Sequence, residues 1–428
     1  MNKQILKLAL PNIVTNITVP LLGIVDLALM GHLNSPVYIG AIALGGTVFN
    51  IIYSGFAFLR MGSSGLTAQA YGAKNHEEVA LVLQRSLLVG FGMAVLLIIM
   101  MYPVQWTAFN LLDGSHQVKH FAREYFYIRI LAAPATLGLY AFYGWYLGVQ
   151  NSVIPMTIAV TVNVVNIILN FVFVTGFGLK SDGVAWATVI AQYTGLTLAF
   201  LFFFKKYYRY KIKFPFSRIA DKDALRRFFG INSDIFIRSL LFLLVLAVFT
   251  SKSARQGDII LAVNTLLFQL FYFFSYFADG FAFAAEALAG KAKGAGNTPE
   301  LKAVVKNIFI WSWGIALIFT AIYGVSLNKI MSLLTNEPEI LSAAKFYYPW
   351  IIIIPTISIG AFTWDGVFIG ITASKAMRNI SIIVSIFIFL PAYYITYPFW
   401  GNHALWFAFD LFMLTRSLGM WLYSKKEL

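Results

Sequence analysis

The chain has 428 residues, of which 59% are hydrophobic and only 12% are charged, whereas soluble domains carry about 25% charged residues. It contains no cysteine, which excludes disulfides, thiolate metal sites and thiol nucleophiles. A net charge of +14 would suggest nucleic-acid binding in a soluble protein, but here the basic residues collect in short loops between apolar runs. We therefore expect a membrane protein that binds no nucleic acid.

Twelve apolar runs follow one another along the chain, each long enough to cross about 30 Å of hydrocarbon as a helix. The alternating segments of about ten residues that mark membrane barrels are absent. The sequence predicts an all-α polytopic membrane protein with twelve transmembrane helices. The spans lie near residues 8–31, 38–70, 80–103, 124–148, 154–177, 184–205, 229–251, 258–290, 303–328, 343–370, 377–398 and 402–423.

A basic polar stretch separates the first six spans from the last six, and it predicts two lobes. We expect an N-terminal six-helix lobe at 1–204, a linker at 205–228 and a C-terminal six-helix lobe at 229–428. Loops on the side of the linker carry roughly three times as many Lys and Arg residues as loops on the other side. This bias predicts that both termini are cytoplasmic.

The two halves also repeat each other in sequence at an offset of 222 residues. Residues 72–78 and 294–300 share Gly, Ala, Asn and a final acid at matching places. Gly144 and Gly148 in the fourth span recur as Gly366 and Gly370 in the tenth. Because each half has six spans, both halves enter the membrane in the same direction, which is a parallel repeat of the kind that transporters use. Duplication kept only for packing is the alternative.

Asp26 is the clearest ionisable side chain inside a span. No Lys or Arg lies near it on that span, and desolvation disfavours its charged form. Such a carboxylate can bind a proton, a Na⁺ ion or a cationic substrate one at a time, which is the simplest chemistry of antiport. A hydrogen-bonded structural role is the alternative. Pro11 and Pro20 lie on the same span, where each weakens the helix and predicts either a gate or a static kink.

The fifth and sixth spans carry uncharged polar side chains on single helical faces. Asn163, Asn166 and Asn170 are three and four residues apart, so they share one face, and lipid cannot satisfy their amides. Thr188 and Gln192 form a similar pair one turn apart. We expect these five residues to line a substrate- or ion-binding pocket with Asp26. Hydrogen bonds that merely hold helices together, worth about 0.6–2 kcal/mol each, are the alternative.

The C-terminal half contains several acids, for which structural pairing is the favoured interpretation. Asp234 and Arg238 are four residues apart and are predicted to pair with each other. Asp279 and Glu286 share one face of the eighth span, and Asp365 lies in the tenth. The four acids and Arg238 are secondary site candidates. Arg238 and Arg416 are the plausible basic partners of the acids.

Five segments together resemble the multidrug and toxic compound extrusion (MATE) family, and more narrowly its DNA-damage-inducible F (DinF) branch. They are residues 25–31, 58–73, 279–287, 364–370 and 377–379. The resemblance runs the length of the chain and implies a twelve-helix, two-lobed exporter of the MATE fold in the cell inner membrane, driven by a proton or Na⁺ gradient.

The resemblance also implies roles for individual residues. It makes Asp26 the protonation and coupling residue, Pro11 the bend-forming proline, and Asn166, Asn170 and Thr188 the polar positions. Archaeal relatives carry an aspartate where this chain has Asn170, so the resemblance favours titration of Asp26 alone, with one proton or one Na⁺ per cycle.

Residues and resemblance together predict a secondary active multidrug efflux transporter that exchanges amphipathic, cationic compounds for H⁺ or Na⁺. We expect no enzyme activity, no cofactor beyond the coupling ion, no metal site other than a Na⁺ near Asp26, and a monomer whose partners are small molecules and membrane lipids. The alternative is a lipid or lipid-linked oligosaccharide flippase. An intramembrane enzyme and a receptor are disfavoured, because clustered catalytic side chains are missing and the chain is duplicated.

Overall fold

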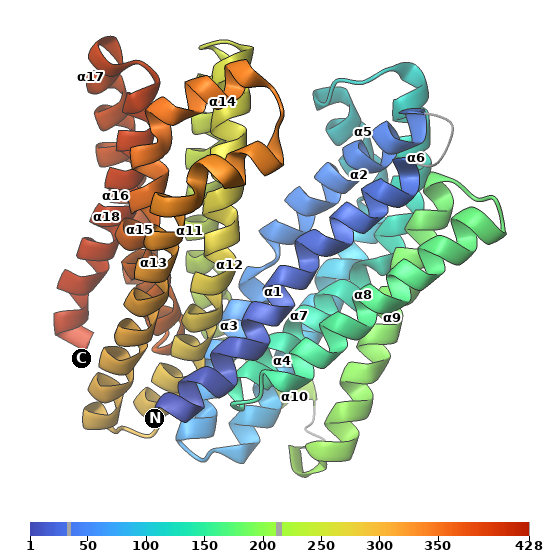
Figure 1. Cartoon of the computed structure of the whole chain (residues 1–428). Helices are drawn as coiled ribbons and strands as arrows, with labels where there is room; N and C mark the ends of the chain where they lie inside the picture. The colour runs from blue at the N-terminus through green and yellow to red at the C-terminus, as the bar shows by residue number, and fades with distance from the viewer. Residues whose placement is uncertain (32–35, 211–215, 428) are drawn as a thin grey trace. The chain divides into compact units, whose positions relative to one another are not determined.

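The computed structural model describes residues 1–31, 36–210 and 216–427 (Figure 1). For residue 19 and residues 21–31 it describes the backbone only, so the predicted Asp26 side chain lies outside the described part. Every regular element in the described residues is helical. The helices of the first half are α1 (Asn2–Gly31), α2 (Pro36–Gly55), α3 (Phe58–Gly72), α4 (His76–Ile99), α5 (Met101–Leu111), α6 (His116–Arg129), α7 (Ala133–Gly148), α8 (Val153–Phe171), α9 (Ser181–Lys206) and α10 (Phe216–Ile219).

The second half is built from longer helices. They are α11 (Lys222–Ala254), α12 (Asp258–Gly294), α13 (Thr298–Leu334), α14 (Pro338–Ala344), α15 (Tyr348–Gly370), α16 (Ser374–Val384), α17 (Leu390–Trp400) and α18 (Asn402–Glu427). Among the described residues, ten helical segments are long and apolar enough to cross a membrane. Helices α1 and α18 are also long, with 30 and 26 residues, and adding them to the ten segments agrees with the twelve predicted spans. The prediction of an all-helical, multi-pass membrane protein is confirmed.

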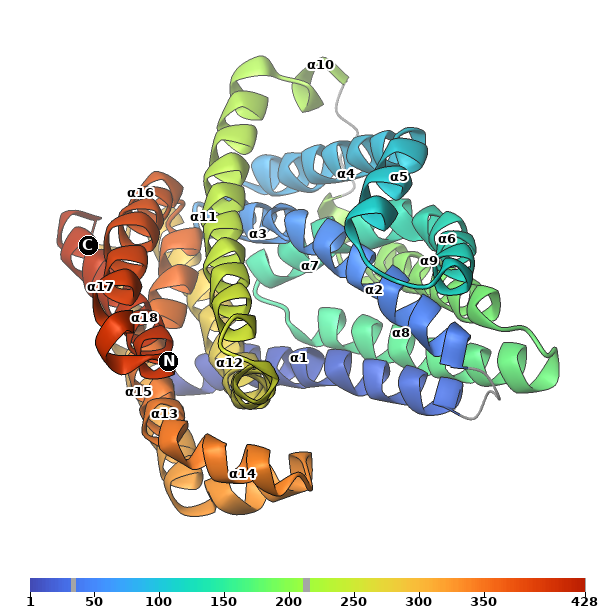
Figure 2. The same ribbon diagram turned by 90° about the horizontal axis from the view of Figure 1, so that it is seen from above.

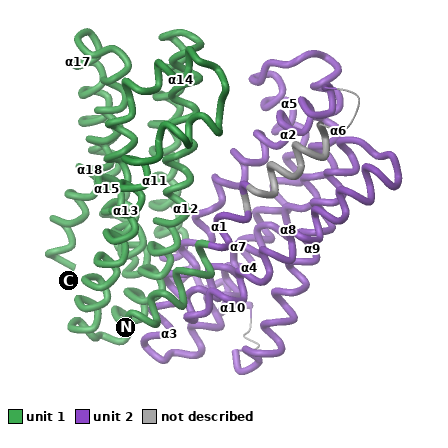
Figure 3. The backbone as a smooth tube through the Cα atoms, in the orientation of Figure 1, with its two compact units in different colours: residues 1–13, 229–428 green, residues 14–228 purple. Residues whose placement is uncertain are grey.

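The chain divides into two compact units, which Figure 3 shows in different colours. Unit 2 comprises Val14–Phe228, and unit 1 comprises Met1–Ile13 together with Phe229–Leu428. The boundary within the first helix falls between Pro11 and Pro20, so α1 contributes residues to both units. The lobe and linker limits predicted at residues 204, 205 and 228 stay a prediction.

The repeated glycines mark the same close helix contact in both units. In unit 2, a Cβ atom on Gly144 would collide with the carbonyl oxygen of Arg60 on α3. In unit 1, a Cβ atom on Gly366 would collide with the carbonyl oxygen of Ala282 on α12. Both members of each pair are shifted by 222 residues. Glycine is needed here because the two backbones touch, and the duplication seen in sequence is therefore also a duplication in space.

Helix ends follow the repeat as well. Asn75 caps α4, with its Oδ1 accepting from the backbone N–H of Glu78 at 3.0 Å. Asn297 caps α13, with its Oδ1 accepting from the N–H of Glu300, also at 3.0 Å. The residues just before these caps, Lys74 and Gly296, both have positive φ, as a tight turn between helices requires.

Candidate functional site

A buried polar network occupies the interior of unit 2, with Thr188 on α9 at its centre. The Asn166 Nδ2 donates to Thr188 Oγ1 at 3.1 Å, and Asn170 Nδ2 donates to Asn166 Oδ1 at 3.1 Å. The Thr188 hydroxyl donates to the carbonyl of Val184 at 3.0 Å. Asn166 and Asn170 are 1% and 0% exposed, as their spacing on one face of α8 predicts.

Arg129, at the end of α6, adds a cation to this network. Its Nη1 donates to the Tyr125 hydroxyl at 2.6 Å and to Thr188 Oγ1 at 3.5 Å. The guanidinium also lies 5.2 Å from the centre of the Phe49 ring. The sequence prediction did not include Arg129 among the site residues, although it is an ionisable side chain inside the fourth span, the criterion that selected Asp26.

Asn163 connects the amide face of α8 to α1. Its Nδ2 donates to the carbonyl oxygen of Thr18 at 3.3 Å, and Figure 2 shows α1 beside α8. Thr18 precedes Asp26 by eight residues, which is about 12 Å along a helix. Gln192 is half-buried one turn beyond Thr188 and takes no part in the described network. Three of the five predicted polar residues thus meet directly, and a fourth binds the backbone of the helix that carries Asp26.

Helices α1 and α8, which the Asn163–Thr18 hydrogen bond joins, both have irregular backbones. Pro11 and Pro20 both lie within the continuous helix α1, where each removes a backbone N–H donor. Helix α8 ends at Phe171, one residue after Asn170, and passes into a turn of π-helix, η2 (Val172–Gly176). Another π-helical turn, η5 (Ser385–Phe389), follows α16 in unit 1. Such turns widen a helix locally and recur at functional sites.

Two of the predicted acids of unit 1, Asp234 and Asp365, are held by arginines, but in a different pairing from the predicted one. Asp234 accepts from Arg378 Nη1 at 2.6 Å and from the Ser374 hydroxyl at 2.8 Å. The predicted pair of Asp234 with Arg238 is therefore wrong: Arg238 binds Asp365 instead. Spacing along α11 indicated only which side chains share a face, whereas α15 and α16 supply the actual partners.

Asp365 on α15 forms ion pairs with two arginines. Both Arg238 from α11 and Arg416 from α18 donate to its Oδ2 atom, and all three side chains are largely buried. The expectation that acids of this half pair with Arg238 and Arg416 is confirmed for Asp365. Two cations on one carboxylate leave Asp365 unable to serve as an open cation site in this arrangement.

Asp279 and Glu286 lie on α12, where Glu286 is 1% exposed and Asp279 is half-buried. The Glu286 carbonyl oxygen lies against Gly370, at the helix contact that the repeat conserves. The corresponding position in the first half is Ser64, so the duplication has kept the backbone contact and changed the side chain. Among the described residues, no group of three or more His, Asp or Glu side chains could hold a metal ion.

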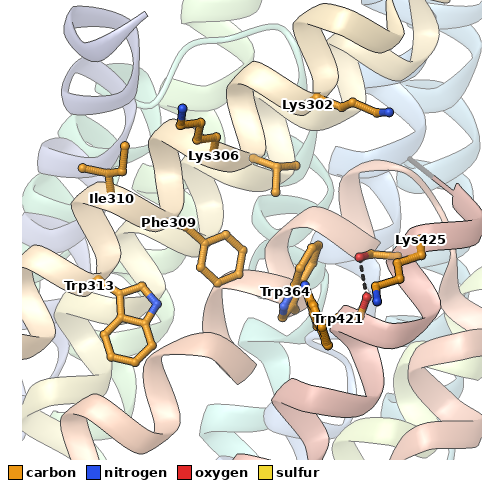
Figure 4. A pocket seen from close by; sticks show the side chains of 10 residues that line it. Lys302, Lys306, Phe309, Ile310, Trp313, Trp364, Trp421 and Lys425 are labelled. Atoms are coloured by element: carbon orange, nitrogen blue, oxygen red, sulfur yellow. Dashed lines mark hydrogen bonds between the residues drawn. The ribbon is translucent and has the colours of Figure 1, made fainter.

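A surface groove of about 800 Å³ runs along unit 1 between α13, α15 and α18 (Figure 4). Three lysines and three tryptophans contribute to its lining, namely Lys302, Lys306, Lys425, Trp313, Trp364 and Trp421. Lys425 Nζ lies 4.2 Å from the centre of the Trp421 ring. Lysine and tryptophan together are typical of the membrane–water interface. The residues that line the groove lie on other helices than the residues of the polar network of unit 2.

The sequence matches the family model described as MatE over residues 11–172 and 235–395, one segment in each half. The chain belongs to the MatE family. It is 39% identical to "DNA damage-inducible protein F" of Escherichia coli over 419 residues, covering 98% of this chain and 91% of the relative. It is 25% identical to "Probable multidrug resistance protein NorM" of Thermotoga maritima over 80% of this chain and 74% of the relative. The resemblance to this family and its DinF branch is confirmed.

Solved structures of MATE transporters share the fold. One, the outward-facing conformation of a multidrug resistance MATE family transporter, superposes with a TM-score of 0.89 at 18% identity, covering 99% of this chain and 95% of that one. A Vibrio cholerae MATE transporter in a bent form gives 0.90 at 19% identity, covering 99% and 96%. This MatE protein therefore has the MATE fold. Its relatives are transporters of the drug-efflux type, and it is not an enzyme.

Proposed function

We propose that this MatE protein exports amphipathic, cationic organic compounds in exchange for H⁺ or Na⁺, with Asp26 as the coupling residue. The observation that carries the proposal is the hydrogen bond from Asn163 to the Thr18 carbonyl, which joins the polar face of α8 to the helix that bears Asp26. A change of charge on Asp26 can act on this contact through a single helix. The same helix contains Pro20, where a missing backbone hydrogen bond makes bending less costly.

The exchange follows from competition for one carboxylate. In the outward-open protein a proton or Na⁺ binds at Asp26 and neutralises it, which removes the attraction for a cationic substrate and releases it. In the inward-open protein the ion leaves and a cytoplasmic substrate takes its place. The amides and hydroxyl of Asn166, Asn170 and Thr188 offer neutral donors and acceptors, which suit substrates of varied shape. This arrangement supports exchange of one ion per cycle at this site.

The proposed setting is the cell inner membrane, with both termini in the cytoplasm and the protein acting as a monomer. The excess of Lys and Arg in the loops on the linker side supports this orientation. In unit 2 the predicted linker is fixed to α4: Arg85 Nε and Nη2 donate to the carbonyls of Ile219 and Arg218 at 3.3 and 3.2 Å. These contacts hold basic residues close to the end of a span, as the orientation requires.

Transport in reconstituted vesicles tests this function. Efflux of a fluorescent lipophilic cation is measured with a pH gradient and a Na⁺ gradient imposed separately, for the wild type, Asp26→Asn and Asp113→Asn. Asp113 is an exposed acid of the same unit and serves as the matched control. We expect one gradient to drive efflux in the wild type and the control but not in Asp26→Asn. Undiminished efflux by a folded Asp26→Asn protein would overturn the proposal.

The same vesicles address the flippase alternative. A lipid flippase moves labelled phospholipid or lipid-linked oligosaccharide between leaflets, and it needs a wide basic cavity for phosphate groups. Several described arginines inside the spans are already engaged: Arg238 and Arg416 with Asp365, Arg378 with Asp234, Arg85 with Glu78 and Arg129 with Tyr125. We therefore expect labelled lipid to stay in its leaflet while the organic cation is exported. Lipid movement without cation export would favour the flippase.

A further inference from the structure

Asp410 is a buried acid of α18 that neither the predicted coupling site nor the ion pairs of unit 1 use. It is 4% exposed, and neither carboxylate oxygen has a hydrogen-bond partner in the described structure. It is the ninth residue of the helix that begins at Asn402, or about 12 Å from that end. A charged carboxylate without donors at such a depth is costly, and an ionisable residue in a span indicates function by default.

Helix α18 packs against α15 both before and after Asp410. One end of this contact is the Trp350 Nε1, which donates to His403 Nδ1 at 2.9 Å. At the other end, Ser417 fills the space beside Gly360. Asp410 lies midway between His403 and Ser417 along α18, so the packed stretch encloses it. Lipid and bulk water are kept from the carboxyl group, in agreement with its burial.

No described charge compensates Asp410. Arg416, six residues further along α18, is bound to Asp365 together with Arg238. His403 is engaged by Trp350, and no ion pair joins Asp410 to any described residue. On the neighbouring helices, Arg378 of α16 is bound to Asp234 and Lys252 of α11 lies over the Tyr394 ring. Lys375 of α16 is exposed, Asp279 of α12 has an interaction of its own, and Tyr393 of α17 is a phenol. The acid therefore has to be neutralised by something outside the protein.

A cluster of polar side chains lies on the Asn402 side of Asp410. One turn before Asp410, the Trp406 Nε1 donates to Asn264 Oδ1 at 2.9 Å. The Asn264 Nδ2 donates in turn to Ser253 Oγ and to Asn402 Oδ1, both at 2.7 Å. Asn264 and Ser253 line a cavity of about 170 Å³ whose wall includes the polar side chains of Thr250, Thr265 and Gln269. This volume is large enough for several waters.

From this geometry we propose that Asp410 is a second proton-binding carboxyl group, placed in unit 1 and reached through the polar cavity at Asn264. A proton fits the site better than Na⁺, because a hard cation needs several oxygen ligands. The side chains one turn away on α18 are Trp406, Phe407, Met413 and Leu414, and none of them supplies an oxygen. The two oxygens of Asp410 suit one proton, which binds to the carboxylate and leaves the acid neutral.

The repeat gives this position a counterpart in unit 2. Thr188 is the eighth residue of α9, and Asp410 is the ninth residue of α18, the last long helix of the other half. Thr188 forms the centre of the polar network of unit 2. Both halves thus place a buried polar side chain at nearly the same point of their sixth span. In unit 2 this side chain is the neutral hydroxyl of Thr188, which forms hydrogen bonds. In unit 1 it is the carboxyl group of Asp410, for which the described structure contains no hydrogen-bond partner.

Infrared spectroscopy of the purified full-length protein tests the proposal directly. Protonated carboxyl groups absorb separately from carboxylates, so a pH titration shows which acids take up protons. The wild type is compared with Asp410→Asn, Asp26→Asn and the exposed control Asp113→Asn. We expect a protonated-acid band that grows as the pH falls and is lost in Asp410→Asn but kept in the other two variants. Asp410→Glu, which retains an acid, should move this band rather than remove it.

Other outcomes would overturn the assignment. A spectrum of Asp410→Asn identical to that of the wild type would mean that Asp410 stays ionised. A band that is lost in Asp410→Asn but does not change with pH would identify a permanently protonated structural acid. A band that Na⁺ suppresses at constant pH would replace the proton by Na⁺. Because the measurement needs no transport and the Asp26→Asn variant is included, failure at Asp410 and failure of the proposed antiport are separate results.

Discussion

The two units have the same backbone contacts and different polar interiors. In each, a glycine pair lets two helices touch, at Gly144 and Gly148 in unit 2 and at Gly366 and Gly370 in unit 1. The interior of unit 2 is joined by amides, a hydroxyl and one arginine. The interior of unit 1 is joined by ion pairs between arginines and aspartates.

This difference teaches which features a duplicated membrane fold keeps. Close backbone contacts tolerate no added atoms, so both copies retain glycine there. Polar side chains only need to be satisfied, and amides and ion pairs achieve that equally well. Ion pairs fix the charge of Asp234 and Asp365, whereas the amides and the hydroxyl of Asn166, Asn170 and Thr188 carry no charge and leave room for a change of charge nearby. We therefore assign the main coupling step to unit 2 and test the comparison with matched variants.

The largest effect is expected for Asp365→Asn in unit 1. The substitution leaves Arg238 and Arg416 buried beside a neutral amide, and breaking a buried pair in this way costs about 3–5 kcal/mol. Thermal unfolding of the detergent-purified protein should show a strongly lowered midpoint, with Asp113→Asn unchanged. An unfolding midpoint equal to that of the wild type would mean that ion pairs do not hold unit 1 together.

Gly144→Ala and Gly366→Ala should destabilise the two units by similar amounts. Each added methyl group meets a backbone carbonyl on the neighbouring helix, and such overpacking costs about 1–3 kcal/mol. Gly46→Ala in unit 2 and Gly314→Ala in unit 1 are matched controls, because nothing lies within 4 Å of their added atoms. If only one of the two test variants lowers the unfolding midpoint, the contacts are not equivalent and the structural repeat is incomplete.

Asn166→Leu separates a functional network from a structural one. The substitution removes the hydrogen bonds to Thr188 and Asn170, which costs about 1 kcal/mol of stability in a membrane interior. We expect a modest loss of stability but a tenfold or greater loss of efflux per folded molecule. Thr157→Val, an exposed change on the same helix, should leave efflux intact. Efflux that falls only in proportion to the folded protein would reduce the network to helix packing.

The smallest effects are expected for the helix caps Asn75→Ala and Asn297→Ala, at about 1 kcal/mol each. The Asn297 Nδ2 also donates to Glu300 Oε2 at 2.9 Å, so the variant in unit 1 should cost slightly more. Asn110→Ala, an exposed change without a capping contact, is the control. Chemical denaturation in detergent gives the comparison, and a larger loss in Asn75→Ala would contradict the added contribution of the Asn297–Glu300 hydrogen bond.

The fold was predictable from sequence because its main determinants are local. Apolar run length predicts spans, and glycines repeated at one offset predict the duplicated contact between α3 and α7 and between α12 and α15. The shared face of Asn166 and Asn170 was predictable from helical spacing for the same reason.

The partners of charged groups were less predictable because they come from distant helices. Asp234 binds Arg378, 144 residues away, although Arg238 is one turn along the same helix. Nothing in the local spacing distinguishes these two arginines. Arg129 and Asp410 are a different case, since both are ionisable residues within predicted spans. Asp26 was selected because it is an ionisable side chain inside a span. A search of every span for such side chains would have found Arg129 and Asp410 as well.

Competition between protons and substrate tests the central assignment most directly. The affinity of the purified protein for a fluorescent lipophilic cation is measured across a pH series in the wild type, Asp26→Asn and Asp113→Asn. Where one proton competes for one carboxylate, the apparent Kd rises on acidification, approaching about tenfold per pH unit. We predict this rise in the wild type and in Asp113→Asn, and a Kd independent of pH in Asp26→Asn. An unchanged pH dependence in Asp26→Asn would contradict the assignment of coupling to the first helix.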